Sequence, residues 1–518
     1  MSFSYDVLTE PWIPVELTDG SKCSLGLLAA LERAHEIRAI RAPTPLGNLG
    51  MHRFLIAFLL DAFRPPDVDA IADLVALGRF DGGALRCYVD QCRSEGVSFD
   101  LFDERRPFLQ SAFPPEDQDS QLAVQLFPEI PGGNNHIHFR HEYEADHAFT
   151  PVQCLTALTL LAPFALMYSR SVSLSINGVP PTYLLYGGRT LFETLALSLV
   201  PLSRDDLSGP PVAWRDFSAV PEGAQAVRAS ILGGLTAQPR RVQLIPEESE
   251  GGVVVRRIRY KKGYDYKGLT YFDPHVAYYE DDKGALRALT PREDRALWRD
   301  LGTMVGSKTK CALLSALDVT METLPDKPST VPLKATALVT RQKGATRAAI
   351  EWSEEELPLR AYLLKDPDKA VFFQAMLGLM ENAAGCLASV MRKPLKALRG
   401  EKASKKAASV FAAFADEAKL VCLSRSNAYV NDRLLCALEA CDFASRENER
   451  SLRDAFAREI RGCALDVFGQ YARRVQASAR ALEWQAAAEQ SLRAMLGKVL
   501  KGGKPDDIGT GHGDDERD

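Results

Sequence analysis

Half of the histidines in this sequence lie in one short stretch, NNHIHFRHEYEADHAF, residues 134–149. The stretch holds four of the eight histidines and three interleaved acids: His136, His138, His141, His147, Glu142, Glu144 and Asp146. On a strand, His136 and His138 would place both imidazoles on one face. His141 or Asp146 could complete a metal site there, as in a metal-dependent nuclease. Because PGG precedes the stretch and FTP ends it, an exposed polar loop or a ligand-contacting loop fits equally, and the residues leave all three interpretations open.

Two other stretches carry a high local density of positive charge, the feature that attracts phosphate groups. The first, residues 253–268, interleaves cations with tyrosines: Arg256, Arg257, Arg259, Tyr260, Lys261, Lys262, Tyr264, Tyr266 and Lys267. The second, residues 391–409, has one acid, Glu401, among seven cations: Arg392, Lys393, Lys396, Arg399, Lys402, Lys405 and Lys406. The net charge of the whole chain is −5, so any binding to nucleic acid must come from such patches. Each patch alone is equally consistent with a solvated surface.

The composition is that of a globular protein with more than one core. Of 518 residues, 46% are apolar and 25% are charged, and roughly two to four domains are expected at this length. The start, MSFSYDVLTEPWIP, lacks the segments of a signal peptide, and no apolar run reaches the roughly 20 residues of a membrane span. The ten cysteines include no CxxC pair. We therefore expect reduced thiols, a cytoplasmic location and no membrane contact.

Proline divides the sequence into two regions. No proline occurs between Pro394 and Pro505, and proline is the residue that most strongly disfavours a helix interior. Apolar residues recur at three- and four-residue spacing in segments of residues 371–391, 408–423, 427–443, 452–475 and 482–500. The pattern predicts an antiparallel bundle of four or five helices at residues 366–502, followed by a Gly- and Asp-rich disordered tail at 503–518.

The first 365 residues differ from this bundle. Helical patterns at 50–63 and 152–167 alternate with β-like segments at residues 240–246, 252–263, 275–284 and 331–340. Long irregular stretches separate them, which are typical of functional loops. The sequence therefore predicts an α+β protein: a large mixed N-terminal domain at 1–365 with long loops, then the helical bundle. It contains no GxGxxG, GxxxxGK[ST], HExxH or GxSxG motif, so no cofactor is expected.

Seven short motifs carry a resemblance to one protein family, in the same order over nearly the whole chain. They are YDVLTEPWIPVELTDGSKCSLGLLAALERAHEI, LFDERRPFLQ, HFRHEYEADHAFTPVQCLTAL, VPPTYLLYGGRTLFETLALSLVPL, LTAQPRRVQLIP, GLTYFDPHVAYYEDDKG and ATRAAIEWSEEELPLR. With them the sequence resembles the CasA family, the large subunit of the type I-E CRISPR Cascade complex. The end of the last motif leads into the region that the proline pattern predicts to be a bundle.

The resemblance implies a DNA-recognition subunit without catalytic activity. CasA proteins recognise the PAM in double-stranded DNA, promote opening of the duplex, hold the displaced single strand and recruit the helicase–nuclease. They work with the crRNA 5′ handle and with the handle-binding, backbone and small subunits of Cascade. No cysteine lies between residues 155 and 310, where the family's zinc-binding cysteines would stand, so we expect no metal.

On this resemblance the histidine stretch is the loop that lies beside the crRNA handle and the handle-binding subunit. Phe139 matches the family's loop phenylalanine, and His141 stands where the family often has asparagine. Rings can stack on bases and polar side chains can reach phosphate or sugar. The expected contacts to the handle or its subunit are Phe139, Arg140 and His141.

The resemblance also assigns contacts to the PAM duplex. Lys261, next to Lys262, corresponds to the lysine that precedes the family's DPH turn. The family's glycine-rich loop corresponds to residues 168–178, where Gly178 is the one glycine. Hydroxyl and guanidinium groups can enter a narrow minor groove in place of close backbone approach. The expected donors in this loop are Arg170, Ser171 and Ser173.

The family's glutamine wedge corresponds to residues 340–349. One alignment places Arg347 at the wedge position, whereas a shifted alignment places Gln342 there. The sequence leaves both assignments open. The polar residues just before Gly344 are expected to hold the flanking phosphates: Arg341, Gln342 and Lys343.

The 391–409 patch is expected to form an electrostatic track for the displaced strand. Its residues are Arg392, Lys393, Lys396, Lys402, Lys405 and Lys406. Two functions of other classes remain as alternatives: a metal-dependent nuclease that uses the 136–147 histidine cluster, and a helical adaptor that binds only protein. DNA cleavage with bound metal by the isolated chain would favour the first. Absence of salt-dependent DNA binding by the assembled complex would favour the second.

Overall fold

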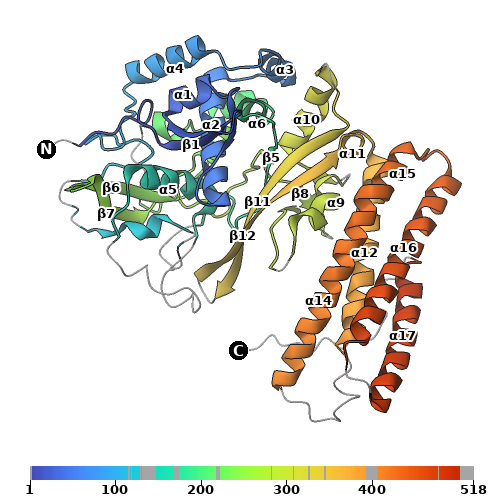
Figure 1. Ribbon diagram of the computed structural model, residues 1–518. Coiled ribbons are helices and arrows are strands. Elements are labelled where there is room, and N and C mark those ends of the chain that lie inside the picture. Colours follow the sequence, from blue (N-terminus) through green and yellow to red (C-terminus); the bar gives the residue numbers. More distant parts are fainter. Residues whose placement is uncertain are drawn as a thin grey trace. The chain divides into compact units, whose positions relative to one another are not determined.

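The computed structural model describes two compact units. The first comprises residues 1–304 and 308–364, and the second comprises residues 305–307 and 365–518. The sequence places this boundary between residues 365 and 366. Described are residues 3–114, 117, 119–128, 130, 147–166, 174–217, 222–281, 283–293, 295–306, 308–324, 327–343, 346–392, 405–475 and 478–501, with backbone only at 343, 346 and 405–411. The predicted α+β class with a C-terminal helical bundle is confirmed (Figure 1).

The first unit begins with a small antiparallel sheet of order β2–β1–β3. Its strands are Lys22–Leu25, Ile13–Leu17 and Ile37–Ile40. Helix α2, Pro45–Phe63, follows and is largely apolar and buried on nearly all sides, which marks a central core helix. The Thr44 side chain accepts a hydrogen bond from the Gly47 amide and caps its start.

Close packing of two helices forms the centre of the first unit. Helix α2 lies against α5, Pro151–Phe164. A Cβ atom at Gly50 would lie 2.6 Å from the Thr159 hydroxyl and 2.8 Å from Leu160, so glycine permits this approach. Around α2, aromatic rings from distant parts of the sequence meet at centroid distances of 4.8 to 6.1 Å, among them Trp12, Phe54, Phe58, Phe80, Tyr88, Phe108, Phe192 and Trp214.

Two long antiparallel hairpins project from this core and carry predicted DNA-contacting residues. The first consists of β6, Arg240–Ser249, and β7, Gly252–Lys262, with the two-residue strand β4, Gln121–Leu122, at its edge. The second consists of β11, Thr330–Lys343, and β12, Thr346–Arg360. Strand β5, Tyr183–Tyr186, pairs with β11 only at residues 333–336, so the far end of this hairpin is a two-stranded ribbon.

The other elements of the first unit are short. A fourth sheet has the order β10–β8–β9, with strands Thr309–Lys310, Tyr278–Glu280 and Leu286–Ala288. The remaining α-helices are α1 Leu27–Glu32, α3 Val68–Ala76, α4 Gly82–Ser94, α6 Leu191–Ala196, α7 Arg204–Ser208, α8 Ile231–Leu235, α9 Leu301–Met304, α10 Ala312–Thr323 and α11 Tyr362–Lys365. Short 3₁₀ segments are η1 Ala123–Leu126, η3 Ala213–Arg215 and η4 Leu297–Asp300.

The second unit is the predicted antiparallel bundle. Its long helices are α12 Pro367–Met391, α14 Lys405–Tyr429, α16 Arg446–Ala472 and α17 Ala479–Val499. A π-helical turn, η5 Val430–Leu434, and the short α15, Leu435–Ala440, connect α14 to α16. Helix α12 packs against the other three long helices. Side-chain caps at Asp366, Ser445 and Ser478 fix three of the helix starts.

Helices α2 and α12 are long and apolar enough to cross a membrane by length and composition alone. Of the apolar window, 83% is buried inside the structure for α2 and 61% for α12. A core helix of a globular protein has the same composition, and burial on most sides is what such a helix requires. The two helices are therefore accounted for as core elements of their units.

Candidate nucleic-acid interface

The β6–β7 hairpin arranges the first basic stretch in a row. Its register pairs Arg241 with Lys261 and Gln243 with Arg259. Side chains alternate between the two faces of a strand, and the opposite face is buried through Val242, Leu244 and Ile258. The cations of the outward face are Arg241, Arg257, Arg259 and Lys261.

The chain's own acids and hydroxyls contact this basic row. Lys261 Nζ lies 2.5 Å from Asp117 Oδ2, and Arg257 donates two hydrogen bonds of 2.8 Å to Ser120. The hydrogen bond between Lys261 and Asp117 raises the pKa of the lysine and lowers the pKa of the carboxyl group, so both stay charged at neutral pH. An external phosphate that binds Lys261 must therefore compete with Asp117 or share the ammonium group with it.

The buried face of the same hairpin holds one side of the predicted groove loop. Arg240 stands opposite Lys262 in the register and is only 2% exposed. Its Nη2 donates to the Leu166 carbonyl at 2.6 Å, and its Nε donates to the Tyr260 hydroxyl at 2.9 Å. Lys262 itself pairs with Asp265 at 3.0 Å. Arg240 thus bonds Tyr260, on the strand that carries the two lysines, and Leu166. Leu166 is the last described residue before Arg170, Ser171 and Ser173.

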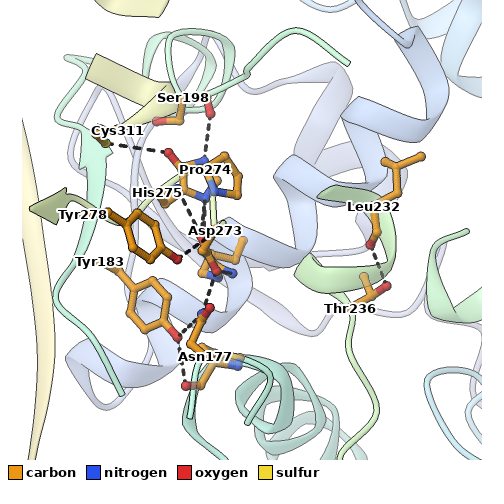
Figure 2. A network of polar contacts seen from close by, with 12 residues as sticks. Asn177, Tyr183, Ser198, Leu232, Thr236, Asp273, Pro274, His275, Tyr278 and Cys311 are labelled. Atoms are coloured by element: carbon orange, nitrogen blue, oxygen red, sulfur yellow. Dashed lines mark hydrogen bonds and ion pairs between the residues drawn. The ribbon is translucent and has the colours of Figure 1, made fainter. Parts of the chain in front are cut away.

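A buried polar network fixes the other side of that loop (Figure 2). Asn177 donates to Asp273 Oδ2 at 2.8 Å and to the Tyr183 hydroxyl at 3.1 Å. The Tyr183 hydroxyl in turn donates to the Pro163 carbonyl at 3.0 Å. One tyrosine therefore joins the chain just before the loop to the chain just after it.

Asp273 is anchored by an arginine from α2. Arg53 donates two hydrogen bonds to its carboxylate, at 2.9 and 2.6 Å, and both side chains are buried. Burial alone would lower the pKa of Arg53 and raise that of Asp273, but their mutual attraction reverses both directions and keeps both groups charged. A bidentate pair of this kind is rigid as well as strong.

His275 completes the network as a neutral imidazole. Its Nδ1 accepts a hydrogen bond from Arg53 at 3.1 Å, and its Nε2 donates to the Ser198 carbonyl at 2.9 Å, an arrangement that fits the Nε2–H tautomer. Burial lowers the pKa of His275 to about 4. The DPH turn is therefore a buried support for the surface loops. Its charged carboxylate, Asp273, is already paired with Arg53.

The two candidate wedge residues lie side by side. Gln342 is the cross-strand partner of Arg347 at the end of the β11–β12 ribbon, so both side chains leave the same face. Arg347 Nη1 donates to the Thr340 hydroxyl at 3.0 Å, and partial burial lowers the pKa of the guanidinium. Arg341 is on the opposite face and forms an ion pair with Glu293.

The predicted displaced-strand track begins at the end of α12. Arg392 caps this helix, and its Nη2 lies 2.5 Å from Asp416 Oδ1. Lys405 and Lys406 start α14, and only their backbone is described. Lys393, Lys396 and Lys402 lie outside the described residues. The described ends of this stretch are therefore the C-terminal residue of α12 and the first turn of α14.

A sequence profile of the family described as CRISPR-associated protein Cse1 matches residues 6–467. The chain belongs to the CasA/Cse1 family. A CRISPR-associated protein CasA/Cse1 from Thermus thermophilus is 30% identical over 516 residues, which cover 96% of this chain and 98% of that protein. The predicted membership of the type I-E Cascade large-subunit family is therefore confirmed.

Solved structures of the CasA/Cse1 family share this fold. The crystal structure of Thermus thermophilus CasA matches with a TM-score of 0.75 and 26% identity, covering 96% of this chain and 100% of that one. A chain of a CRISPR RNA-guided surveillance complex matches with a TM-score of 0.69 and 17% identity, covering 95% and 99%. At this level of identity the match to the surveillance-complex chain shows a shared fold.

Several residues that the CasA/Cse1 resemblance points to lie outside the described part of the chain. They are the loop residues Phe139, Arg140 and His141, the groove-loop residues Arg170, Ser171 and Ser173, and the side chain of Lys343. The histidine cluster with Asp146 lies outside it too, apart from His147. Among the described residues, no three histidines, cysteines or acids are grouped so that they could hold a metal ion.

Sequence reasoning missed the residues that position the CasA/Cse1 surface. Arg240, Asn177 and the Arg53–Asp273 pair carry no local signal, since their partners are distant in the sequence. Arg53 and Asp273 are separated by 220 positions. The DPH motif was visible, but only the fold reveals that its aspartate is buried against a helix near the N-terminus.

Proposed function

We propose that this CasA/Cse1 chain recognises a PAM in double-stranded target DNA and promotes opening of the duplex beside it. In the same proposal the chain contacts the crRNA 5′ handle through the 139–141 loop, stabilises the displaced strand through the bundle turn and recruits the helicase–nuclease. Its role is non-catalytic. Family membership supports the assignment to Cascade, and the geometry of the two hairpins supports the contacts to DNA.

The observation that carries the proposal is the pairing of Gln342 with Arg347 at the end of a two-stranded ribbon. Opening a base step costs a few kcal/mol of unstacking, which an inserted group must offset. A planar amide and a planar guanidinium on one face can stack on an exposed base and bond to base edges. We therefore expect Gln342 and Arg347 to act on the same base step. The remaining question is how much each side chain contributes to opening the duplex.

Lys261 is the proposed contact to the PAM duplex on the other hairpin. A minor groove offers acceptors to a lysine and attracts positive charge when it is narrow. The Lys261–Asp117 ion pair supports this role because both side chains remain partly accessible to solvent, with exposed fractions of 29% and 13%. Arg240 of the same hairpin bonds the carbonyl of Leu166, which precedes the groove loop, so we expect the lysine and the loop to approach the duplex together.

A library of PAM sequences tests the proposal on the reconstituted complex. We expect the complete complex to enrich a narrow set of PAMs and Lys261→Ala to lose that enrichment. Arg287→Ala, at an exposed arginine of β9 that pairs with Asp281, is a matched control and should keep it. Enrichment that persists in Lys261→Ala would contradict the assignment of this lysine, and DNA cleavage by the isolated chain with divalent metal would contradict the non-catalytic role.

A further inference from the structure

A cavity of about 210 Å³ lies next to the β6–β7 hairpin, and the proposed contacts leave it without a function. Three arginines line it, Arg105 and Arg106 from the LFDERRPFLQ motif and Arg241 from β6. Among the described lining residues, Asp216 is the one acid. The cavity therefore has an excess of positive charge at its wall.

Two of the three guanidinium groups at this cavity stack on aromatic rings. Arg105 makes no side-chain hydrogen bond or ion pair with the described part of the chain. Arg106 lies over the ring of Phe217 at 4.2 Å, and Arg241 lies over the ring of Phe113 at 4.6 Å. Stacking on aromatic rings orients a guanidinium and leaves most of its N–H donors available for an anion.

Two buried polar atoms at the cavity have no hydrogen-bond partner among the residues that the structure describes. They are the hydroxyl oxygen of Ser111 and Nε of Arg241. Ser111 is only 8% exposed, and its backbone amide donates to the Val242 carbonyl at 2.8 Å, which fixes the residue against β6. A buried donor without a partner destabilises the folded state, so a ligand that accepts hydrogen bonds from both atoms would offset that cost.

We propose that this cavity binds one backbone phosphate of the target DNA. Phosphate oxygens accept several charge-assisted hydrogen bonds from arginine, and a cavity of this size is below the roughly 300–1,000 Å³ of sites for whole small molecules. Arg241 stands directly opposite Lys261 in the hairpin register, so a duplex that reaches the lysine passes the cavity. The choice of target DNA as the source of the phosphate rests on the proposed PAM function.

The first test uses the purified full chain and inorganic phosphate, without nucleic acid. Phosphate should raise the thermal unfolding temperature more than chloride at equal ionic strength, because it binds the folded state. Arg105→Gln should reduce this difference, and Arg79→Gln, at an exposed arginine of the same unit, should not. Ser111→Asp should abolish it by placing a carboxylate in the cavity. An unchanged phosphate response in both cavity variants would overturn the site.

The second test uses the reconstituted complex and a PAM-containing duplex. Loss of one phosphate contact should reduce the slope of log affinity against log salt by about 0.9 in Arg105→Gln relative to Arg79→Gln. If Arg105→Gln instead impairs assembly with the crRNA-bearing core and leaves this slope unchanged, an acidic group of a neighbouring subunit or the crRNA occupies the cavity, and the proposal is wrong. If Lys261→Ala loses PAM binding while both Arg105 readouts are unchanged, the PAM function survives and the cavity proposal fails.

Discussion

The buried network around Asp273 and the outer ends of the two hairpins use similar side chains in opposite ways. In the network, Arg53 and Asp273 are buried and bonded to each other by two hydrogen bonds. At the hairpins, Lys261 shares an accessible carboxylate, and Arg347 bonds a neutral hydroxyl. The buried ion pair holds the surface loops in position. The side chains at the hairpins can give up their present partners and bind a ligand instead. The distinction makes different predictions for stability and for DNA binding.

The largest expected effect is on stability, from Arg53→Met. Removing one partner of a buried ion pair leaves an uncompensated charge and costs roughly 3–5 kcal/mol. We expect urea unfolding to show a loss of this size for the first unit. The double variant Arg53→Met/Asp273→Asn should recover part of it, since it removes the stranded carboxylate. A loss below about 1 kcal/mol would show that the network does not fix the surface in this way.

The second prediction concerns pH. Burial lowers the pKa of His275 and of His52 from 6.5 to about 4. The unfolded chain therefore binds protons first as the pH falls, and the stability from these two groups is present above pH 6.5 and lost between 6.5 and about 4. With both groups the slope should reach up to about 2.7 kcal/mol per pH unit, and His52→Leu should halve it. A free energy of unfolding that is constant from pH 6.5 to 5 would contradict this account.

The third prediction concerns the bundle turn. Reversal of Lys402, Lys405 and Lys406 to Glu should reduce the salt slope of complete R-loop binding by about 2, because three contacts to a single strand would be lost. PAM selection should remain as in the unmodified complex. Reversal of Arg493 to Glu on α17 is a control on the same unit. An unchanged slope would identify the turn as a solvated surface.

The smallest expected effect comes from freeing Lys261. Asp117→Asn should strengthen binding of the PAM duplex by at most about fivefold, since a solvent-accessible ion pair holds its partners only weakly. Asp90→Asn changes the net charge equally, at an exposed residue of α4, and provides the control. If both variants strengthen binding equally, the effect is one of overall charge, and no exchange of Asp117 for a phosphate is needed to explain it.

Much of the fold could be predicted from local patterns. The bundle follows from a proline-free stretch with helical periodicity, and the segments predicted as strands at 240–246, 252–263 and 331–340 lie within β6, β7 plus one residue, and β11. Strand β12 was missed because Glu354, Glu355 and Glu356 resemble a solvated helix. Acids are tolerated there because β12 is the edge of its sheet, where charge also discourages pairing with other chains.

The site was predictable only in part. From the sequence, Gln342 and Arg347 are alternative candidates for the wedge. They are five positions apart, and an alignment can place only one of them at the wedge position. The antiparallel register makes them neighbours, and Gly344, which lies between them in the sequence, was the signal that could have indicated a reversal of the chain. Arg105 and Arg241 gave no such signal, because nothing local indicates that residues 136 positions apart line one cavity.

The measurement that most directly tests the account compares a closed PAM duplex with the same target pre-opened as a bubble. We expect Arg347→Ala to weaken R-loop formation on the closed duplex by on the order of tenfold or more relative to the bubble, since the wedge offsets a few kcal/mol of unstacking. Gln342→Ala should shift the same ratio, and Arg341→Ala, on the opposite face, should leave it unchanged. If Arg347→Ala, Gln342→Ala and the double variant all leave the ratio unchanged, the ribbon end does not open DNA, and the central claim is wrong.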